Sequence, residues 1–393
     1  MQAFINARLF TVSGPVIDQG TLLEKDGRII AVGRNLPVPE TASTVDLAGK
    51  TLMPGLVEAH CHLGIFDFWQ AEAGAKTGSS SLGEAVTPAL DYYYALNPHS
   101  PGLKRARQTG VTTLLTGPGS GKVVGGLSVV TRTYGTDREQ IVLRRPAGVK
   151  MAFGENPKHF GKQGQMPATR MGVAALLRSA LVAARNYLAK QVSDDPGKRP
   201  PHDAELEIMA RVLKRELRAR IHAHRADDIM SILRIVDEFN IDITLEHATE
   251  AYKVAGEIAR RRIPCVTGPS YGSRDKVELR DETFANPGIL ERAGIQVAIT
   301  TDASIVAIDY LRHEAILAHR EGMSAAGALG AITLTAAEII GVADRVGSLD
   351  VGKDADLLVL NGDPLEFTSR VERVYGAGRL IYHRETHREE WDQ

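Results

Sequence analysis

Short apolar segments rich in β-branched residues alternate with helical stretches through the middle of the chain, and this alternation constrains the fold more than any other feature. Strands separated by helices build parallel sheets, because a parallel connection must cross back over the sheet. Eight such strands predict an α/β fold, the (β/α)8 barrel. The spacing between the third and fourth strands is short for such a unit. The expected strands lie near 53–60, 110–117, 126–133, 147–154, 218–224, 242–248, 263–269 and 295–302, and the expected helices span 171–191, 204–217, 226–239 and 308–321.

The two ends of the chain have a different pattern, in which short apolar segments are separated by turn residues. The first 50 residues show it, and it returns in residues 355–382. The pattern is typical of small antiparallel sheets. Neither end has enough apolar length to fold alone. We therefore expect residues 1–52 and 345–393 to combine into a small β-sandwich domain beside a barrel over residues 53–344.

The composition points to a small-molecule substrate. The 393 residues include 47 Lys and Arg against 48 Asp and Glu, so no net field would attract nucleic acid or an anionic membrane. The two cysteines, Cys61 and Cys265, are too few for a disulfide framework and fit a reducing compartment, which suggests a cytoplasmic protein. The chain has no run of 18 apolar residues and no basic, then apolar, N-terminus, so we expect neither a membrane span nor a signal peptide.

Residues 54–62 form an apolar run that ends in two histidines, His60 and His62. Residues i and i+2 of a strand project from the same face, so both imidazoles can bind one ion at the mouth of a barrel. The pair is weak evidence alone, because with 12 histidines in the chain a chance His-x-His has a probability of roughly one in three. The alternative is two structural histidines at a strand end.

Further polar residues lie at the ends of other expected strands, where barrel active sites form. The fifth strand ends in His222 and His224, the sixth in His247, and the eighth in Asp302.

The fourth strand brings two candidate anions. Glu155 is an anion as encoded, whereas Lys150 is one only if carbon dioxide carboxylates its amine. Either anion can bridge two metal ions. The alternatives are a capping or solvent-facing Glu155 and a buried, paired Lys150.

Taken together, these residues resemble the amidohydrolase superfamily, in the branch of imidazolonepropionase and related metal-dependent hydrolases. The resemblance covers nearly the full length. It rests on residues 53–62, on His222, His247 and Asp302, and on residues 347–357; residues 110–126 and 154–158 are similar to one subgroup of that branch.

The resemblance implies roles for these residues. His60, His62 and Asp302 would hold the more buried divalent ion, and His222 and His247 the other. Glu155 or carboxylated Lys150 would lie between the two ions. Glu155 is favoured here because a short carboxylate needs no modification. The cofactor is expected to be one or two ions of zinc, or of manganese or iron, and Asp302 and His247 are the candidate catalytic residues. Superfamily members often self-associate, so a homo-oligomer is expected.

Substrate contacts are expected from charged and aromatic residues beyond the strand ends. His224, Arg225 and Lys158 are placed to assist at a developing oxyanion or to bind a substrate carboxylate. Tyr271 and Arg274 follow the seventh strand, where substrate loops belong. The alternatives are a structural hydrogen bond for His224 and solvated or ion-paired charges for Arg225 and Lys158.

Two other motifs are set aside. The glycine-rich stretch 117–122 lacks the spacing of a phosphate-binding loop, since Val123 follows the lysine, and is better explained as a loop lining the cleft. Cys61 lies between the two histidines along the strand, so it should point away from them into the core.

The expected activity is hydrolysis of a carbon–nitrogen bond in an amide, dipeptide-like or cyclic amide substrate by a metal-activated hydroxide; a dipeptidase fits within this class. One alternative is hydrolytic deamination of a small heterocycle at the same site. An alternative of another class is a non-catalytic scaffold with an amidohydrolase-like fold.

Overall fold

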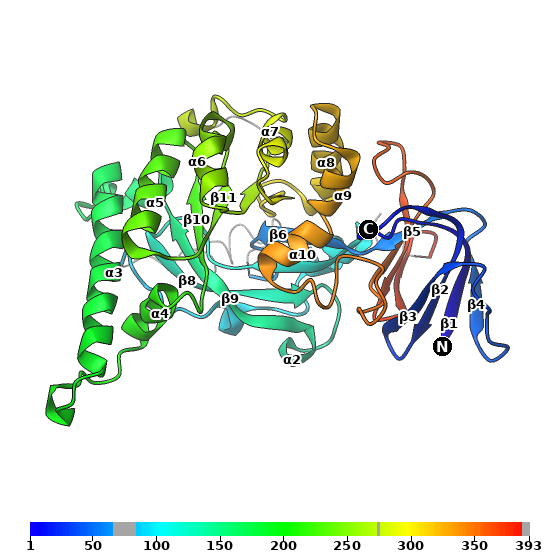
Figure 1. Cartoon of the computed structure of the whole chain (residues 1–393), viewed down its shortest axis with the longest axis horizontal. Helices are drawn as coiled ribbons and strands as arrows, with labels where there is room; N and C mark the ends of the chain where they lie inside the picture. The colour runs from blue at the N-terminus through cyan, green and yellow to red at the C-terminus, as the bar shows by residue number, and fades with distance from the viewer. Residues whose placement is uncertain (66–83, 273–275, 387–393) are drawn as a thin grey trace.

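The computed structural model describes residues 1–65, 84–272 and 276–386 (Figure 1). Two eight-stranded sheets organise them. In Figure 1 the sheet of the expected barrel, surrounded by helices, occupies the left and centre, and the sheet built from the two ends of the chain lies at the right.

All eight expected barrel strands are present, and they neighbour one another in chain order. They are buried along most of their length because helices cover the outer face of the sheet. The strands are β6 (Leu56–Cys61), β7 (Val111–Thr116), β8 (Val124–Arg132), β9 (Val142–Ala152), β10 (Ala219–Ala223), β11 (Ile243–His247), β12 (Cys265–Thr267) and β13 (Val297–Ile299).

The sheet is not fully parallel, which corrects the regular (β/α)8 expectation. Strand β8 runs antiparallel to both of its neighbours, β7 and β9, whereas the other paired strands are parallel. The reason is the length of the connections. Residues 117–123 and 133–141 join these strands, and each connection is shorter than the dozen or so residues that a parallel crossover needs.

The helices that cover the barrel match the sequence expectation closely. The expected helix 226–239 is α5 (Ala226–Phe239), and 171–191 is α3 (Arg170–Gln191). Helix α4 (Ala204–Leu213) ends earlier than expected, and the stretch 308–321 begins with a 3-10 turn, η7 (Ile308–Tyr310), before α8 (Leu311–Arg320). The remaining helices are α1 (Pro101–Gln108), α2 (Arg138–Ile141), α6 (Ala255–Arg260), α7 (Asn286–Arg292), α9 (Ala325–Gly330) and α10 (Leu334–Ile340). Of the helices in the described ranges, none has the length and apolar character needed to cross a bilayer.

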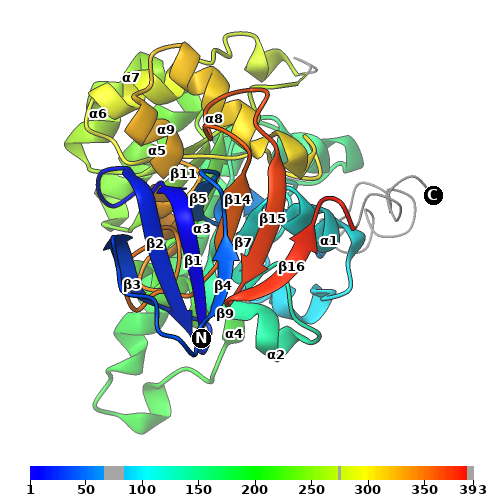
Figure 2. The same cartoon turned by 90° about the vertical axis from the view of Figure 1, so that its right-hand side faces the viewer.

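The two ends of the chain share one sheet and one core, as expected for a composite unit (Figure 2). Strand β5 pairs antiparallel with β14 and thereby joins N-terminal to C-terminal strands. The rings of Phe4 and Tyr375 meet edge to face with centroids 4.9 Å apart in the core beneath the sheet. The strands are β1 (Gln2–Leu9), β2 (Ile17–Lys25), β3 (Arg28–Arg34), β4 (Ser43–Asp46), β5 (Thr51–Pro54), β14 (Leu357–Leu360), β15 (Val371–Gly376) and β16 (Arg379–His383).

Gly55 separates the two sheets. The stretch expected as one strand near 53–60 is two strands, with β5 in the terminal sheet and β6 in the barrel. The Gly55 amide donates to the carbonyl of Asp356 in the terminal unit. A Cβ at Gly55 would lie 2.2 Å from Oγ1 of Thr112, so only glycine allows the backbone to approach β7 this closely.

Candidate metal centre

Strand ends bring the five strongest sequence candidates to one end of the barrel. His60 lies in β6 and His62 directly after it, His222 lies in β10, His247 ends β11, and Asp302 follows β13. The four histidines are buried, and the side chain of Asp302 is 13% exposed. The carboxyl ends of parallel strands meet at one edge of the sheet, which explains why residues so far apart in the chain converge.

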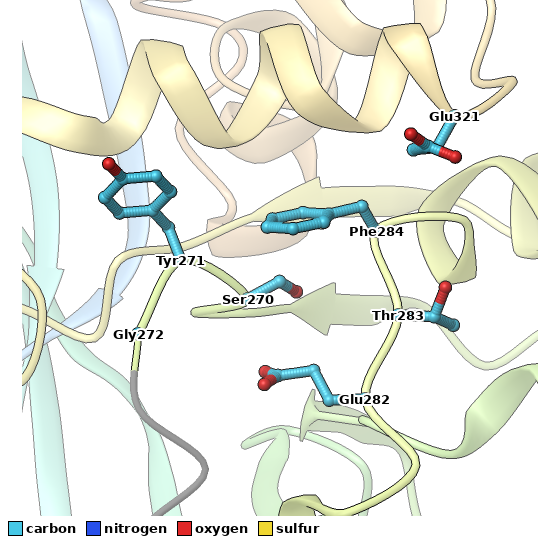
Figure 3. A pocket seen from close by; sticks show the side chains of 7 residues that line it. All are labelled: Ser270, Tyr271, Gly272, Glu282, Thr283, Phe284 and Glu321. Carbon is cyan, nitrogen blue, oxygen red and sulfur yellow. The ribbon is translucent and has the colours of Figure 1, made fainter.

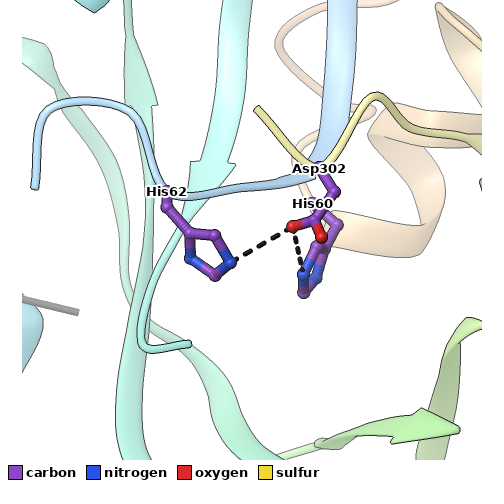
Figure 4. Close-up of side chains that lie close together, drawn as sticks. All are labelled: His60, His62 and Asp302. Carbon is purple, nitrogen blue, oxygen red and sulfur yellow. Dashed lines mark ion pairs between the residues drawn. The ribbon is translucent and has the colours of Figure 1, made fainter. Parts of the chain in front are cut away.

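His60, His62 and Asp302 form the tightest group (Figure 4). One carboxylate oxygen of Asp302, Oδ1, lies 3.1 Å from Nε2 of His62 and 3.4 Å from Nε2 of His60. The second oxygen, Oδ2, lies 4.0 Å from Nε2 of His247. Two imidazoles and a carboxylate are a donor set that zinc and iron take in proteins.

The backbone at Asp302 and at His247 has a left-handed conformation, which directs both side chains toward this group. Both have positive φ, 51° for Asp302 and 67° for His247, a left-handed conformation that costs a non-glycine residue about 1 kcal/mol or more. In a regular strand His247 and its neighbour Glu246 would point to opposite faces. The turn at His247 lets both side chains contact the cluster, Glu246 through His60 and His247 facing Asp302.

Each histidine is held from outside the centre by its Nδ1. Nε2 of His60, His62 and His247 faces the centre, whereas Nε2 of His222 also lies 3.3 Å from Nδ2 of Asn156. Nδ1 of His62 contacts the Gly117 carbonyl at 2.8 Å, and Nδ1 of His247 the Gly268 carbonyl at 2.8 Å. Nδ1 of His222 lies 2.9 Å from Oγ of Ser120. Outer partners of this kind fix the ring orientation and the tautomer of metal-binding histidines. The glycine-rich loop 117–123 thus supports two of these rings, which agrees with its expected place beside the cleft.

The outer partner of His60 is a buried ion pair that the sequence analysis missed. Nδ1 of His60 lies 3.0 Å from Oε2 of Glu246, and the other carboxylate oxygen lies 2.9 Å from the guanidinium of Arg220. Both charged residues are fully buried. The attraction of Arg220 and His60 outweighs the effect of burial and lowers the pKa of Glu246. The available signal was a charged residue inside each of two apolar strands.

Glu58 is a second buried carboxylate that the sequence analysis missed. It lies two residues before His60 and accepts hydrogen bonds from the amides of His60 and Thr301 and from Oγ1 of Thr301. These bonds tie β6 to the segment that carries Asp302. Burial raises the pKa of Glu58 to about 7 despite the bonds.

The electrostatics favour neutral imidazoles around an anion. Burial and the neighbouring rings hold the pKa values of His222 and His247 well below the usual value, so both are uncharged at neutral pH. Burial alone would raise the pKa of Asp302, but the surrounding imidazoles hold it well below its ordinary value. Neutral imidazole and ionised carboxylate are the forms that bind metal ions.

Of the two candidate bridging anions, only Lys150 is at the cluster. It lies in β9, is 2% exposed, and its Nζ is 3.1 Å from Nε2 of His60. Burial lowers the pKa of its amine to about 8.

Glu155 lies elsewhere, which argues against the preference for it as the bridging ligand. It follows the end of β9, and its side chain is 43% exposed. It pairs with Lys158 at 2.8 Å and with Arg170 at 3.0 Å. The physical reason is position: Lys150 lies within the strand and points into the barrel, whereas Glu155 begins a surface turn, η3 (Asn156–Gln163).

The expected substrate-binding residues divide between the cluster and the surface. His224 is buried beside His222, with ring centroids 4.6 Å apart. Arg225 forms a two-pronged ion pair with Asp227, at 2.8 and 2.9 Å, and Lys158 is paired with Glu155, so both follow the alternative of surface charges. Arg274 lies outside the described residues.

Tyr271 lines a pocket of about 690 Å³ beyond the end of β12 (Figure 3). Phe284 and Ser270 share the pocket, and the ring of Tyr271 stacks on Tyr310 with centroids 5.0 Å apart. The same loop begins at Gly268, whose carbonyl holds His247. A short segment of backbone, residues 268–272, therefore contacts His247 at one end and lines the pocket at the other.

One buried atom is consistent with a bound ion. Nε2 of His247 makes no hydrogen bond to the parts of the chain that the structure describes, although the residue is 1% exposed. A buried polar atom without a partner is costly, and a metal ion between His247 and Asp302 would supply one. The nitrogen and oxygen donors here suit a divalent transition ion.

Comparison with known proteins agrees with this geometry. The amidohydrolase family model matches residues 51–381, so the chain belongs to the amidohydrolase family. The chain is 26% identical to imidazolonepropionase of Sphingopyxis alaskensis, with 94% of each chain covered. It is also 26% identical to amidohydrolase tasK of Hapsidospora irregularis, over 88% of this chain but only 38% of that protein.

A solved structure shows the same fold over the whole length. An amidohydrolase from Thermotoga maritima is 37% identical, with a TM-score of 0.92, and the match covers 98% of this chain and 100% of that one. The expected family and its imidazolonepropionase-related branch are confirmed. The class of enzyme is confirmed with them: the chain is a hydrolase that acts on carbon–nitrogen bonds.

Proposed function

We propose that this chain hydrolyses a carbon–nitrogen bond of a small amide, dipeptide-like or cyclic amide substrate, with one or two divalent ions held at the mouth of the barrel. The observation that carries the proposal is the convergence of Nε2 of His60 and Nε2 of His62 on one oxygen of Asp302 while each Nδ1 is held from outside. A structural histidine pair at a strand end needs no such convergence.

A divalent ion in this place would lower the pKa of a water toward neutrality and polarise the scissile carbonyl. His60, His62 and Asp302 would hold one ion, and His222 would hold the other. His247 faces Oδ2 of Asp302 at 4.0 Å, between the two sets of ligands.

Asp302 is the group that moves the proton. Its side chain is partly exposed, unlike the histidines around it, so it can face both a water and a substrate. Its low pKa keeps it ionised, ready to take a proton from the attacking water. It then delivers that proton to the leaving nitrogen, which departs as an amine.

Lys150 is the proposed bridging ligand in its carboxylated form. The amine attacks carbon dioxide, a nitrogen–carbon bond forms and one proton is released, leaving a carbamate anion. The reaction needs the unprotonated amine, and a pKa of about 8 makes that form accessible near neutral pH. The position of Nζ, 3.1 Å from Nε2 of His60, supports this role.

The first experiment measures metal content per chain and then turnover. Protein purified without chelator is analysed by inductively coupled plasma mass spectrometry and assayed on N-acyl amino acids, dipeptides and cyclic amides. Metal near one or two equivalents together with hydrolysis of any of these classes supports the proposal. Asp302→Asn is expected to abolish turnover while the circular dichroism spectrum and the melting temperature stay close to the parent values. Full activity in that variant would contradict the role given to Asp302.

A further inference from the structure

A second group of two histidines and one carboxylate lies at the barrel mouth. His222 and His224 are two residues apart at the end of β10, so they project from the same face. Glu278, on the 3-10 turn η6 (Val277–Leu279) beyond β12, reaches them from another loop. One ligand atom of each residue lies within 4.8 Å of the others, and the three residues are 2%, 5% and 1% exposed, respectively.

Two atoms of this group lack hydrogen-bond partners in the described part of the chain: Nε2 of His224 and Oε1 of Glu278. They lie 3.8 Å apart, which is too long for a hydrogen bond. Two ligands that each lie about 2.0–2.2 Å from one zinc ion are at most ~4.4 Å apart, so the separation fits an ion between them. A buried polar atom without a partner is unfavourable, and an ion between these two atoms would give both a partner.

The surrounding structure aims these two atoms at one another. Nδ1 of His224 lies 2.8 Å from Oγ1 of Thr249, which leaves Nε2 directed at Glu278. Oε2 of Glu278 accepts the backbone amide of Glu155 at 3.0 Å, which leaves Oε1 for His224. Gly154 makes room for this approach, because a Cβ there would lie 2.7 Å from Oε2 of Glu278.

Arg170 fixes the outer side of the group. Its guanidinium lies 3.9 Å from Oε2 of Glu278 and binds both oxygens of Asp228, at 3.0 and 3.1 Å. Glu155 contributes a backbone amide here and turns its carboxylate toward Arg170 and Lys158. Glu155, predicted to supply a bridging carboxylate, instead holds the carboxylate of Glu278 through its backbone amide.

We propose that His222, His224 and Glu278 form a binding site for a divalent transition ion such as zinc, manganese or iron. This proposal rests on the proposed function through His222, which both share. It adds His224 and Glu278 as ligands of the second ion. Each end of the cluster then has two imidazoles and one carboxylate, and His247 lies between them, with ring centroids 5.0 Å from His60 and 4.4 Å from His222. Two neutral imidazoles and one carboxylate are donors that divalent transition ions take in proteins.

The test compares metal binding in variants of the two groups. Metal-free protein is titrated with Zn²⁺ by calorimetry and with Co²⁺ by visible absorption, and bound metal is counted by mass spectrometry. Glu278→Gln keeps the acceptor for the Glu155 amide but removes the charge. Glu278→Gln and His224→Gln are each expected to bind one metal ion per chain fewer than the parent, or to bind that ion at least 10-fold more weakly. Each should also lose the visible absorption of Co²⁺ bound at this site. His62→Asn should lose the other equivalent and keep this one.

Asp281→Asn is the matched control, because Asp281 lies in the same loop, is partly exposed and pairs with Lys253. It should bind both ions as the parent does. Glu278→Asp separates loss of a ligand from loss of the fold, because it keeps the charge but shortens the side chain. Weakened metal binding with an unchanged melting temperature in this variant supports the site. Parent-like stoichiometry and affinity in both Glu278→Gln and His224→Gln would overturn the inference. A failure of the proposed function would show itself separately, as an absence of any metal effect in His62→Asn and Asp302→Asn.

Discussion

Oε2 of Glu246 lies 3.0 Å from Nδ1 of His60, inside the barrel and away from solvent. The contact joins the sixth strand of the barrel to the strand that carries the His-x-His pair. A carboxylate behind a ligand histidine fixes the ring and makes the opposite nitrogen a better donor. Burial alone would raise the pKa of Glu246, but Arg220 on the other side of the carboxylate, at 2.9 Å, and His60 hold it below the ordinary value.

Replacing Glu246 with Gln should weaken metal binding through His60. Removing an outer carboxylate of this kind costs roughly 10–100-fold in metal affinity. The change also leaves the buried charge of Arg220 unpaired, which should lower the free energy of unfolding by about 3–5 kcal/mol. Competition against a zinc-chelating dye measures the first effect and urea denaturation the second. The double variant Glu246→Gln with Arg220→Met should recover stability but not affinity; affinity equal to the parent in Glu246→Gln would refute the role.

Lys150 should carry a carbamate in the metal-loaded protein. Incubation with ¹³C-bicarbonate is expected to give a carbamate resonance in the ¹³C NMR spectrum, and Lys150→Ala should lack it. Lys122 offers a matched control, because it is also largely buried but its Nζ contacts Oγ1 of Thr87. Lys122→Ala should keep the resonance. A metal-loaded parent with no such resonance would show that Lys150 acts as an ordinary amine.

Gly55→Ala should destabilise the junction between the two sheets. The new methyl group would lie 2.2 Å from Oγ1 and 2.5 Å from Cγ2 of Thr112, so the backbone must shift, at a cost of about 1–3 kcal/mol. Gly256→Ala is the control: nothing lies within 4 Å of its Cβ position in α6, and the change should stabilise by about 0.5–1 kcal/mol. Thermal unfolding measures both. Thr112→Ala added to Gly55→Ala should return part of the loss, and an unchanged melting temperature in Gly55→Ala alone would contradict the packing argument.

Glu314 should make the protein less stable as pH rises toward 7. It is buried in α8 and accepts the amides of Ser270 and Tyr271, and burial raises its pKa to about 7 from 4.5. Because the native state holds this proton more tightly than the unfolded chain, the stabilisation is complete below pH 4.5 and is lost as pH rises through 7. The difference amounts to about 3 kcal/mol.

Glu314→Gln removes that titration and should still accept the two amides. The free energy of unfolding, measured by urea denaturation between pH 4.5 and 8, should therefore fall more steeply for the parent than for the variant. Glu282, whose charge also raises the pKa of Glu314, is the neighbour to vary next. Parallel stability curves for parent and Glu314→Gln would show that the pKa of Glu314 is the same in the native and unfolded states, contrary to this prediction.

The strands and the ligand histidines could be predicted because both are local properties. A run such as residues 54–62 carries its own apolar pattern and its own His-x-His spacing, and the strand ends at His222 and His247 were found in the same way. The prediction that β8 runs parallel to its neighbours was wrong. The connection 117–123 is too short for a parallel crossover, and its length could have been read from the sequence.

Other features depend on tertiary structure and were out of reach. Whether Lys150 or Glu155 faces the cluster depends on where β9 ends, and a strand boundary is uncertain by a few residues from sequence. Glu278 lies in a loop with no periodic pattern, and its approach to His224 depends on the route of that loop over the barrel. Arg220 and Glu246 were visible as charges within apolar strands, but their pairing required the barrel register.

During synthesis on the ribosome, β5 must wait for its pairing partner β14. Roughly 300 residues separate these partners, and translation at about 5–20 residues per second takes on the order of 15–60 s to cover that distance. During this interval β5 has an unsatisfied edge and the N-terminal strands cannot complete their core. Until the C-terminal strands are synthesised, the N-terminal strands therefore expose an unpaired strand edge and the apolar side chains of the shared core.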